Sequence, residues 1–210
     1  SYTKTTDAWG NVVKAIDPVG EVEYVYSSAG KPSAVKTNGA TVRMVYDAAG
    51  NKTSLIDPDA GTTLYTYAAD GTLLTQTDGL GIKTTNSYDD FGRLSSAQIG
   101  QKTITYTYGN SGYEKMRLTR LAVDDNSIEY SYDKFGRTLT EKRNIHGNGT
   151  YCFSYAYNDK NQLAKTIYPG GLEVAYQYDN NGFNTQTSVG DNIIYKVENF
   201  NGLVSSTSFL

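Results

Sequence analysis

Hydrophobic and polar residues alternate one by one over several short stretches of the chain. In residues 102–108, Tyr106 and Tyr108 occupy one set of alternate positions, and threonines occupy the other. Residues 151–157 and 172–178 show the same period of two, with aromatic or aliphatic residues on one side and mostly small or polar residues on the other. Because successive side chains of a strand point to opposite faces of a sheet, this pattern predicts β-strands whose two faces meet different environments.

A turn motif of the form Tyr-x-Tyr-Asp-x-x-Gly follows these stretches and recurs along the chain. The glycine position repeats every 19 to 25 residues. It is held in turn by Gly10, Gly30, Gly50, Gly71, Gly92, Gly112, Gly136, Asn161, Gly182 and Asn201. Asn tolerates a positive φ better than other residues with a side chain, so we predict a left-handed backbone at each of these positions. The structural turn residues of the clearest copies are Asp47 and Gly50, Asp89 and Gly92, Asp133 and Gly136, and Asp179 and Gly182.

A second turn lies about half a period after the first, as in Asp17-Pro18-Val19-Gly20 and Pro169-Gly170-Gly171. Strands joined by such short turns must be antiparallel. The sequence therefore predicts an all-β fold of tandem antiparallel β-hairpin repeats that form an open, twisted, single-layer sheet or solenoid. We read residues 1–210 as one array of about ten repeats, a fragment of a larger protein.

A five-bladed propeller is the alternative fold, because two such hairpins make one four-stranded blade. Inner and outer hairpins of a blade differ, so a propeller should show a doubled period. Odd and even copies of this repeat show no such difference, which favours the open sheet.

The composition supports this interpretation, with 19 Tyr and 21 Gly but only 4 Pro. A dry core would be filled with Leu, Val, Ile and Phe. Tyr instead combines a large apolar ring with a hydroxyl that needs a polar partner. We therefore expect a sheet one layer thick, with tyrosines packed sideways between neighbouring strands.

These registered copies resemble the YD repeat family, also called RHS repeats, from about Thr6 to Leu203. In that family, similar repeats form a β-sheet that spirals into a hollow shell. In bacterial RHS proteins and in the BC components of insecticidal toxin complexes, the shell encloses a C-terminal toxin domain, and teneurins carry a similar shell. The resemblance implies that this chain is a segment of such a shell, with the remainder of the parent protein, and a C-terminal toxin domain, as its partners.

Two departures from the family limit what the resemblance implies. The family's shell usually ends in an Asp-Pro-x-Gly-Leu motif associated with self-cleavage. Here Gly20 of the first Asp-Pro turn is followed by Glu21, and Pro58 of the second by Asp59 and Ala60, so we assign no autoproteolysis. About ten repeats are also too few to close a shell of the family's size.

The sequence offers no catalytic constellation, and we expect no enzymatic activity, no cofactor and no metal. His146 and Cys152 are the only His and Cys, and we expect His146 in a hairpin loop and Cys152 on the small-residue face of the next strand. The acidic groups Asp57 with Asp59, and Asp124 with Asp125, are interpreted as turn residues, because neither has the spacing of a calcium loop.

Exposed aromatic rows can stack on sugar rings, so the alternative function is a cell-surface carbohydrate-binding or adhesion module. The candidate ligand-stacking residues are Trp9, Tyr106, Tyr108, Tyr130 and Tyr132. The two longest spacings, Gly112 to Gly136 and Gly136 to Asn161, mark an irregular stretch. A specific site should be sought there first.

The net charge of −3 gives no basic footprint for nucleic acid. No apolar run approaches the roughly 20 residues that span a membrane, and no signal peptide opens the chain. We expect a bacterial protein that is secreted or at the cell surface, with its targeting signals outside this fragment. The first and last repeats look like interior ones, which predicts that the fragment self-associates through its terminal strands.

Overall fold

The structure is a computed structural model that describes residues 2–37, 39–200 and 203–209. Within these residues the fold is all-β, and the one helical segment is the short 3-10 turn η1 (Gly112–Glu114). The strands are β1 (Thr3–Thr6), β2 (Val12–Ile16), β3 (Glu21–Tyr26), β4 (Pro32–Thr37), β5 (Ala40–Tyr46), β6 (Lys52–Asp57), β7 (Gly61–Tyr67), β8 (Leu73–Thr77), β9 (Lys83–Tyr88), β10 (Leu94–Ile99), β11 (Lys102–Tyr108), β12 (Leu118–Val123), β13 (Asn126–Tyr132), β14 (Thr138–Ile145), β15 (Gly149–Tyr157), β16 (Leu163–Ile167), β17 (Glu173–Tyr178), β18 (Asn184–Val189), β19 (Asn192–Phe200) and β20 (Leu203–Phe209). No helix in this described part of the chain is long and apolar enough to cross a membrane.

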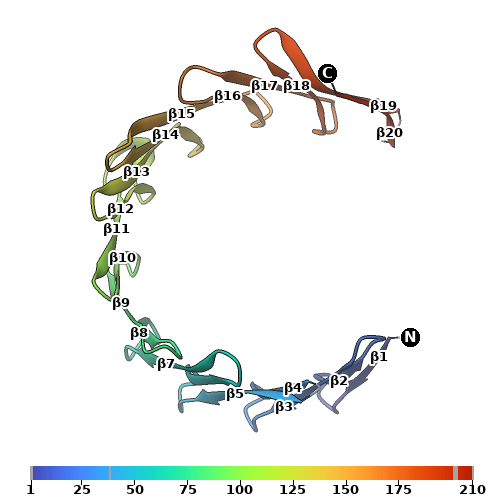
Figure 1. Cartoon of the computed structure of the whole chain (residues 1–210), viewed down its shortest axis with the longest axis vertical. Helices are drawn as coiled ribbons and strands as arrows, with labels where there is room; N and C mark the ends of the chain where they lie inside the picture. Colours follow the sequence, from blue (N-terminus) through green and yellow to red (C-terminus); the bar gives the residue numbers. More distant parts are fainter. Residues whose placement is uncertain (1, 38, 201–202, 210) are drawn as a thin grey trace. The chain divides into compact units, whose positions relative to one another are not determined.

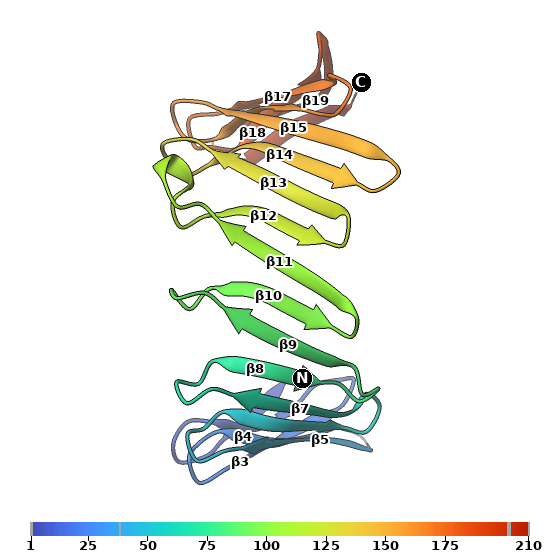
Figure 2. The same ribbon diagram turned by 90° about the vertical axis from the view of Figure 1, so that its left-hand side faces the viewer.

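The chain divides into two compact units, Ser1–Thr103 and Ile104–Leu210. In each unit, consecutive strands pair antiparallel and make a curved meander one layer thick (Figures 1 and 2). The predicted all-β fold of tandem antiparallel hairpins in an open sheet is confirmed. Within each unit the described pairings run unbroken through many more than four consecutive strands, which favours the meander over the separate four-stranded blades of a propeller.

Each Asp-x-x-Gly segment, together with its variants, forms a tight turn that we call a repeat turn. In the third, the Asp47 amide donates to the Asn51 carbonyl (2.9 Å) and the Gly50 amide donates to the Asp47 carbonyl (3.0 Å). The predicted left-handed backbone is confirmed, with φ of 85° at Gly50 and 64° at Asn161. Gly10, Gly30, Gly71, Gly92, Gly136 and Gly182 also have positive φ. Asn201 lies outside the described residues.

Gly112 has the predicted left-handed backbone, with a φ of 58°, but it does not close its repeat turn. In this turn, which begins at Gly109, the amide that returns to the first carbonyl belongs to Met116 (2.9 Å), and Met116 has a φ of 67°. Gly112 instead begins the inserted turn η1. Four extra residues lie inside the loop, so the closing position of the turn moved to Met116, a residue that sequence reasoning does not associate with positive φ.

The second long spacing has a different cause. Strands β14 and β15 are longer than their neighbours, and their paired residues run from Thr140 with Ser154 to Ile145 with Gly149. This hairpin extends beyond the adjacent ones at the edge opposite the repeat turns (Figure 2). The two irregular repeats therefore add their residues at opposite edges of the sheet.

A β-bulge recurs immediately after each repeat turn. In the β5–β6 hairpin, Tyr46 pairs with Lys52 and Val45 pairs with Ser54, so Thr53 is the extra residue. Its hydroxyl donates to the Val45 carbonyl across the hairpin (3.3 Å). The register shifts at the same step in every hairpin from β1–β2 to β17–β18.

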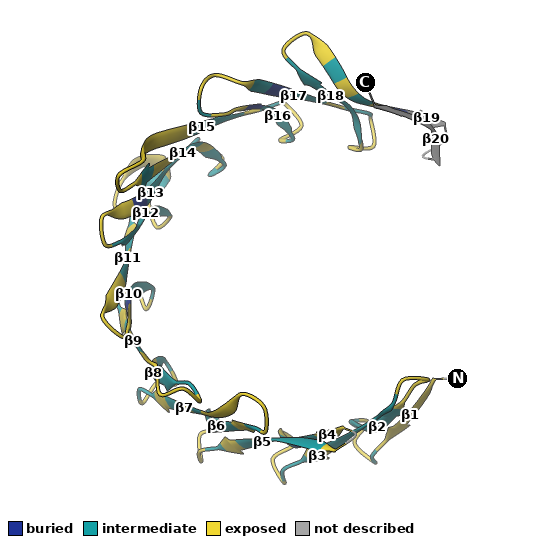
Figure 3. Ribbon diagram, viewed as in Figure 1, coloured by how far each residue is buried: buried dark blue, intermediate teal, exposed yellow. Residues whose placement is uncertain are grey.

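The two faces of the sheet differ as the alternation predicts. On β7, Tyr65 and Tyr67 are half-buried, whereas Leu64 and Thr66, at the alternate positions, are exposed. We call the side bearing these tyrosines the tyrosine face, and the other side the charged face. Among the described residues, the only buried hydrophobic side chains are Ala34, Ala97, Val174 and Val197, as expected for a single layer (Figure 3).

Candidate functional site

The carboxylate of each repeat turn accepts hydrogen bonds from its own loop. Asp89 Oδ1 accepts from the amides of Phe91 (3.0 Å) and Arg93 (2.9 Å), and Asp89 Oδ2 accepts from Arg93 Nε (2.7 Å). These bonds, with that from Arg93 first, lower the pKa of Asp89. The pKa of Asp47 is lowered likewise, first by the Asn51 amide. These carboxylates are occupied as acceptors inside their turns, which is a structural role.

The Asp133 turn repeats this arrangement. Its Oδ1 accepts from the amides of Phe135 and Arg137, and its Oδ2 accepts from Arg137 Nε. Burial raises the pKa of Asp133, but the bonds from Arg137 outweigh burial, and the net pKa is lowered. The Asp179 turn keeps the two amide bonds, to Asn181 and Phe183.

The last tyrosine before a repeat turn bonds to the previous repeat. The Tyr88 hydroxyl donates to the Leu73 carbonyl (2.7 Å), and the Tyr132 hydroxyl donates to the Leu118 carbonyl (2.6 Å). In both cases the acceptor is the first residue of the strand that follows the preceding repeat turn. The same bond is made by Tyr26 to Val12, Tyr46 to Pro32, Tyr67 to Lys52, Tyr157 to Thr138 and Tyr178 to Leu163.

These tyrosine–carbonyl bonds fall where the backbone ladder stops. Between β8 and β9 the paired residues run from Thr77 with Lys83 to Thr75 with Thr85, so Tyr88 lies beyond the last pair. The side chain thus links two hairpins at the edge where their backbones no longer pair. A Phe could fill the same space but could not make this bond, which explains the Tyr at this position of the repeat.

Burial raises the pKa of several tyrosines on this face. For Tyr130 and Tyr155, burial is the main cause and the Glu141 carboxylate adds to it. These hydroxyls therefore stay protonated, and remain donors, throughout the neutral pH range.

Cationic side chains connect successive repeat turns along their edge. Lys31 Nζ donates to the Gly50 carbonyl of the next turn (2.7 Å) and lies 5.5 Å from the Tyr46 ring centroid. Arg137 donates through Nη1 to Asn161 Oδ1 (2.9 Å) and stacks on the Tyr157 ring (4.4 Å). Each cation thus ties one repeat to the next, and the edge is a structural ladder.

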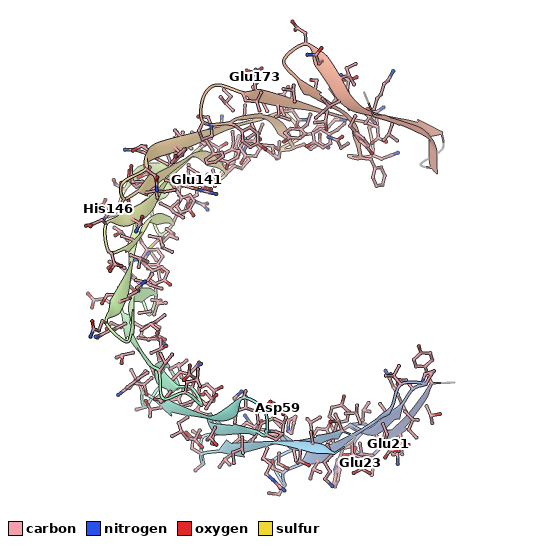
Figure 4. The ribbon with its side chains drawn as sticks, viewed as in Figure 1. Glu21, Glu23, Asp59, Glu141, His146 and Glu173 are labelled. Carbon is pink, nitrogen blue, oxygen red and sulfur yellow. The ribbon has the colours of Figure 1, made fainter. Side chains whose placement is uncertain are left out.

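The tyrosine face lies on the concave side of each unit's sheet. Figure 4 shows Glu141, which pairs with Tyr130 and so shares its face, on the inner side of the curved β14, whereas Glu173 lies on the outer side. The charged face holds cross-strand ion pairs, including Lys165 with Glu173 (2.5 Å) and Lys36 with Glu23 (3.5 Å). All of these side chains are well exposed, so each pair contributes at most about 1 kcal/mol.

The predicted ligand-stacking residues do not form one site. Tyr106 and Tyr108 on β11 share the tyrosine face with Tyr130 and Tyr132 on β13, and β12 runs between the two strands. The Tyr132 ring is covered by Arg117 at 5.5 Å, and its hydroxyl is bound to Leu118. Trp9 belongs to the other unit.

Trp9 lies at the tip of the first repeat turn and is 88% exposed. It lines an open groove with Tyr24 and Tyr26 of the next repeat. Sequence reasoning placed neither of these tyrosines with Trp9, because the contact joins side chains from two successive repeats. Stacking of a ligand at any of these residues stays a prediction.

His146 and Cys152 occupy the places expected for them. His146 lies in the β14–β15 loop, with its Nδ1 3.5 Å from Asp125 Oδ2, and Cys152 is exposed on the charged face opposite Lys142. Asp57 Oδ1 accepts from the amides of Asp59 and Ala60, as a turn residue does. The described residues contain no group of three or more His, Cys, Asp or Glu that could hold a metal ion.

Sequence reasoning missed one charged pair on the tyrosine face. Glu141 and Arg143 are the only charged strand residues on this face within residues 104–197, and Glu141 Oε1 accepts from Arg143 Nε (2.5 Å). The sequence contained the information needed to find this pair, because both residues fall at tyrosine-face positions once the bulge after Gly136 is counted.

No family model matches the sequence, and no curated protein matches it. Solved structures do match. The crystal structure of TcdB2-TccC3 aligns with 94% of this chain at a TM-score of 0.64 and 15% identity, and the match spans 13% of that chain. The structures of TcdB2-TccC3 without its hypervariable C-terminal region and of TcdB2-TccC3-Cdc42 align with 97% of this chain at TM-scores of 0.58 and 0.56, both at 16% identity, over 15% of those chains. At this identity the likeness shows a shared fold.

Proposed function

We propose that this chain is a wall segment of a β-shell that encloses or presents an attached, toxin-like domain of the same parent protein. The observation that carries the proposal is the difference between the two faces of one layer. Charges gather on the convex side, whereas the concave side is mainly aromatic and aliphatic, apart from the pair Glu141 and Arg143, and has no second layer over it in the described residues. Such a wall is suited to contact water with its convex side and a polypeptide with its concave side.

The fold shared with TcdB2-TccC3 supports this role. One of the similar structures is described as lacking a hypervariable C-terminal region, so that protein carries a variable segment at its end. Because this chain spans about 15% of such proteins, the parent protein would supply the rest of the shell and its contents. Secretion or display at a bacterial cell surface, and the lack of enzymatic activity in this segment, are parts of the same proposal.

The test compares the two faces in the isolated chain and in the longer parent protein. Cys152 on the charged face is labelled with a maleimide, and tyrosines on the concave face are nitrated, with sites read by mass spectrometry. Both reactions should proceed in the isolated chain. In the parent protein, nitration of Tyr130 and Tyr155 should fall at least about tenfold while Cys152 still reacts. Equal nitration in both proteins would overturn the proposal.

Carbohydrate binding remains the alternative, and the groove lined by Trp9, Tyr24 and Tyr26 is its best candidate site. A glycan array on the isolated chain tests it directly. Binding that Trp9→Ala abolishes would favour a surface-binding module over a wall segment.

A further inference from the structure

A small pocket opens on the tyrosine face of the second unit, within the irregular stretch of the array. It measures about 250 Å³. Its apolar lining comes from three neighbouring strands, with Leu121 and Val123 on β12, Ile128 on β13 and Ile145 on β14. Ile145 belongs to the end of the β14–β15 hairpin that extends beyond its neighbours, so the lengthened hairpin supplies one wall of the pocket.

Arg143 lines one side of this pocket, opposite Ile128 in the strand register, and its guanidinium extends toward β15. Two contacts orient its guanidinium. Nε donates to Glu141, and the group stacks on the Phe153 ring at 4.9 Å. Phe153 is itself held edge-on by Tyr168, with ring centroids 5.8 Å apart. The side chain of Glu141 is 15% exposed and that of Arg143 is 48% exposed, so the carboxylate is covered and the cation faces outward.

The other end of the guanidinium is available to a ligand. Within the described part of the chain, Arg143 donates a side-chain hydrogen bond to Glu141 alone, through Nε. The two Nη groups form a planar pair of donors that matches the two oxygens of a carboxylate. The orientation is fixed in advance by Glu141 and Phe153, which reduces the entropy lost on binding.

We propose that the pocket and Arg143 form a binding site for a peptide segment in which an apolar side chain is followed by an acidic residue. The pocket takes the apolar side chain, and the Nη groups of Arg143 bind the carboxylate. Charge complementarity identifies the occupant, because Arg143 is the only exposed cation among the strand residues on the tyrosine face within 104–197. This site would be one point at which the concave face contacts an enclosed polypeptide, so the inference rests on the proposed function.

The test uses methyl NMR of the 210-residue chain with Ile, Leu and Val labelled. The probe is the capped dipeptide Ac-Leu-Glu-NH2, and the uncharged Ac-Leu-Gln-NH2 is its matched control. The Glu probe should shift the methyl signals of Ile128 and Ile145 in a saturable way. It should bind at least about tenfold more tightly than the Gln probe, as expected for a charge-assisted bidentate bond.

Two variants isolate the role of the guanidinium. Arg143→Met should lower the affinity for Ac-Leu-Glu-NH2 by about tenfold and leave that for Ac-Leu-Gln-NH2 unchanged. Lys142→Met, one residue away on the charged face, should leave both affinities unchanged. Methyl spectra of the free variants show whether the fold is retained.

Equal binding of the Glu and Gln probes, or unchanged binding by Arg143→Met, would overturn the proposal. If 4-methylpentanoate, which has the same apolar group and carboxylate without a peptide, bound as tightly as the dipeptide, the site would belong to a small organic acid. The labelling experiment on the two faces does not depend on Arg143. Its result therefore supports or contradicts the proposed wall function independently of the peptide-binding result.

Discussion

The hydroxyl of Tyr88 and the backbone carbonyl of Leu73 are joined by a 2.7 Å hydrogen bond that links two successive hairpins. The bond spans fifteen residues of sequence and lies past the last backbone pair of β8 and β9. Since at least seven of the described tyrosines make this bond, the boundaries between repeats depend on a side-chain donor as well as on the backbone ladder.

Tyr88→Phe should therefore lower the free energy of unfolding by about 1 kcal/mol, because the Leu73 carbonyl loses its shorter hydrogen bond and keeps only the one from Asn86 Nδ2 (3.3 Å), while the ring keeps its packing. Tyr88→Leu should cost more, since the ring is lost as well. Urea denaturation of the chain measures both. Tyr113→Phe is the control, because Tyr113 is 63% exposed on the inserted loop, and it should leave stability unchanged. A Tyr88→Phe variant as stable as the parent chain would show that Asn86 or water satisfies the Leu73 carbonyl without cost.

Substitutions at the repeat-turn glycines Gly92 and Gly136 should lower the free energy of unfolding by different amounts. Gly92 and Gly136 have φ of 73° and 78°, so the left-handed backbone predicted for both is confirmed. A Cβ at Gly92 would meet nothing within 4 Å, whereas one at Gly136 would collide with the Arg117 guanidinium. Gly92→Ala should cost about 1–2 kcal/mol from backbone strain alone, with Val worse. Gly136→Ala should cost more, because Arg117 must leave its place over Tyr132.

A double-mutant cycle separates strain from collision at Gly136. Arg117→Ala in the Gly136→Ala background should recover part of the loss, with a coupling energy of at least about 0.5 kcal/mol. The same Arg117→Ala change combined with Gly92→Ala should be additive. Additivity in both backgrounds would mean that Arg117 moves aside freely.

Acid should destabilise the fold through the repeat-turn carboxylates. The pKa values of Asp47 and Asp89 are lowered from 3.8 in the folded chain. A group with a depressed folded pKa contributes stability above its unfolded pKa, and that contribution is lost as the pH falls through the folded value. We expect stability to decline below about pH 4. Asp89→Asn should flatten the decline, as measured by denaturation at pH 3 and pH 6. Asn158 already holds the equivalent place in one turn, so the backbone tolerates the change.

The edge of β1 should support self-association. All four residues of β1 are exposed, and the pairing described for β1 is with β2 alone. Within the described residues no other strand pairs with its second edge, so we predict that this edge recruits further strands. Light scattering over a concentration series should show a rising mass for the chain. Thr3→Lys with Thr5→Lys should suppress the rise, because edge lysines block strand addition. A constant monomer mass would contradict this prediction.

The sequence predicted most of the fold because its signals are local. Alternation at 102–108 and 172–178 and the turn chemistry at Gly92 each depend on a few adjacent residues. The hydrogen-bond partner of Tyr88 could not be predicted from the sequence, because it depends on where the backbone pairing between β8 and β9 ends. Met116 was missed because the insertion lies within the loop, and spacing alone cannot say on which side of Gly112 the extra residues fall. The pocket at Arg143 needs the register of three strands at once.

The bulge that follows every repeat turn has a consequence for how such a chain can grow. A bulge bends its strand and increases the local twist. Because it recurs at the same step of each hairpin, as at Thr53, every repeat carries its own increment of curvature. Duplicating or deleting a whole repeat changes only the length of the sheet and leaves its bend per repeat intact. Gene duplication can thus lengthen or shorten the sheet in single-repeat steps without redesigning any junction.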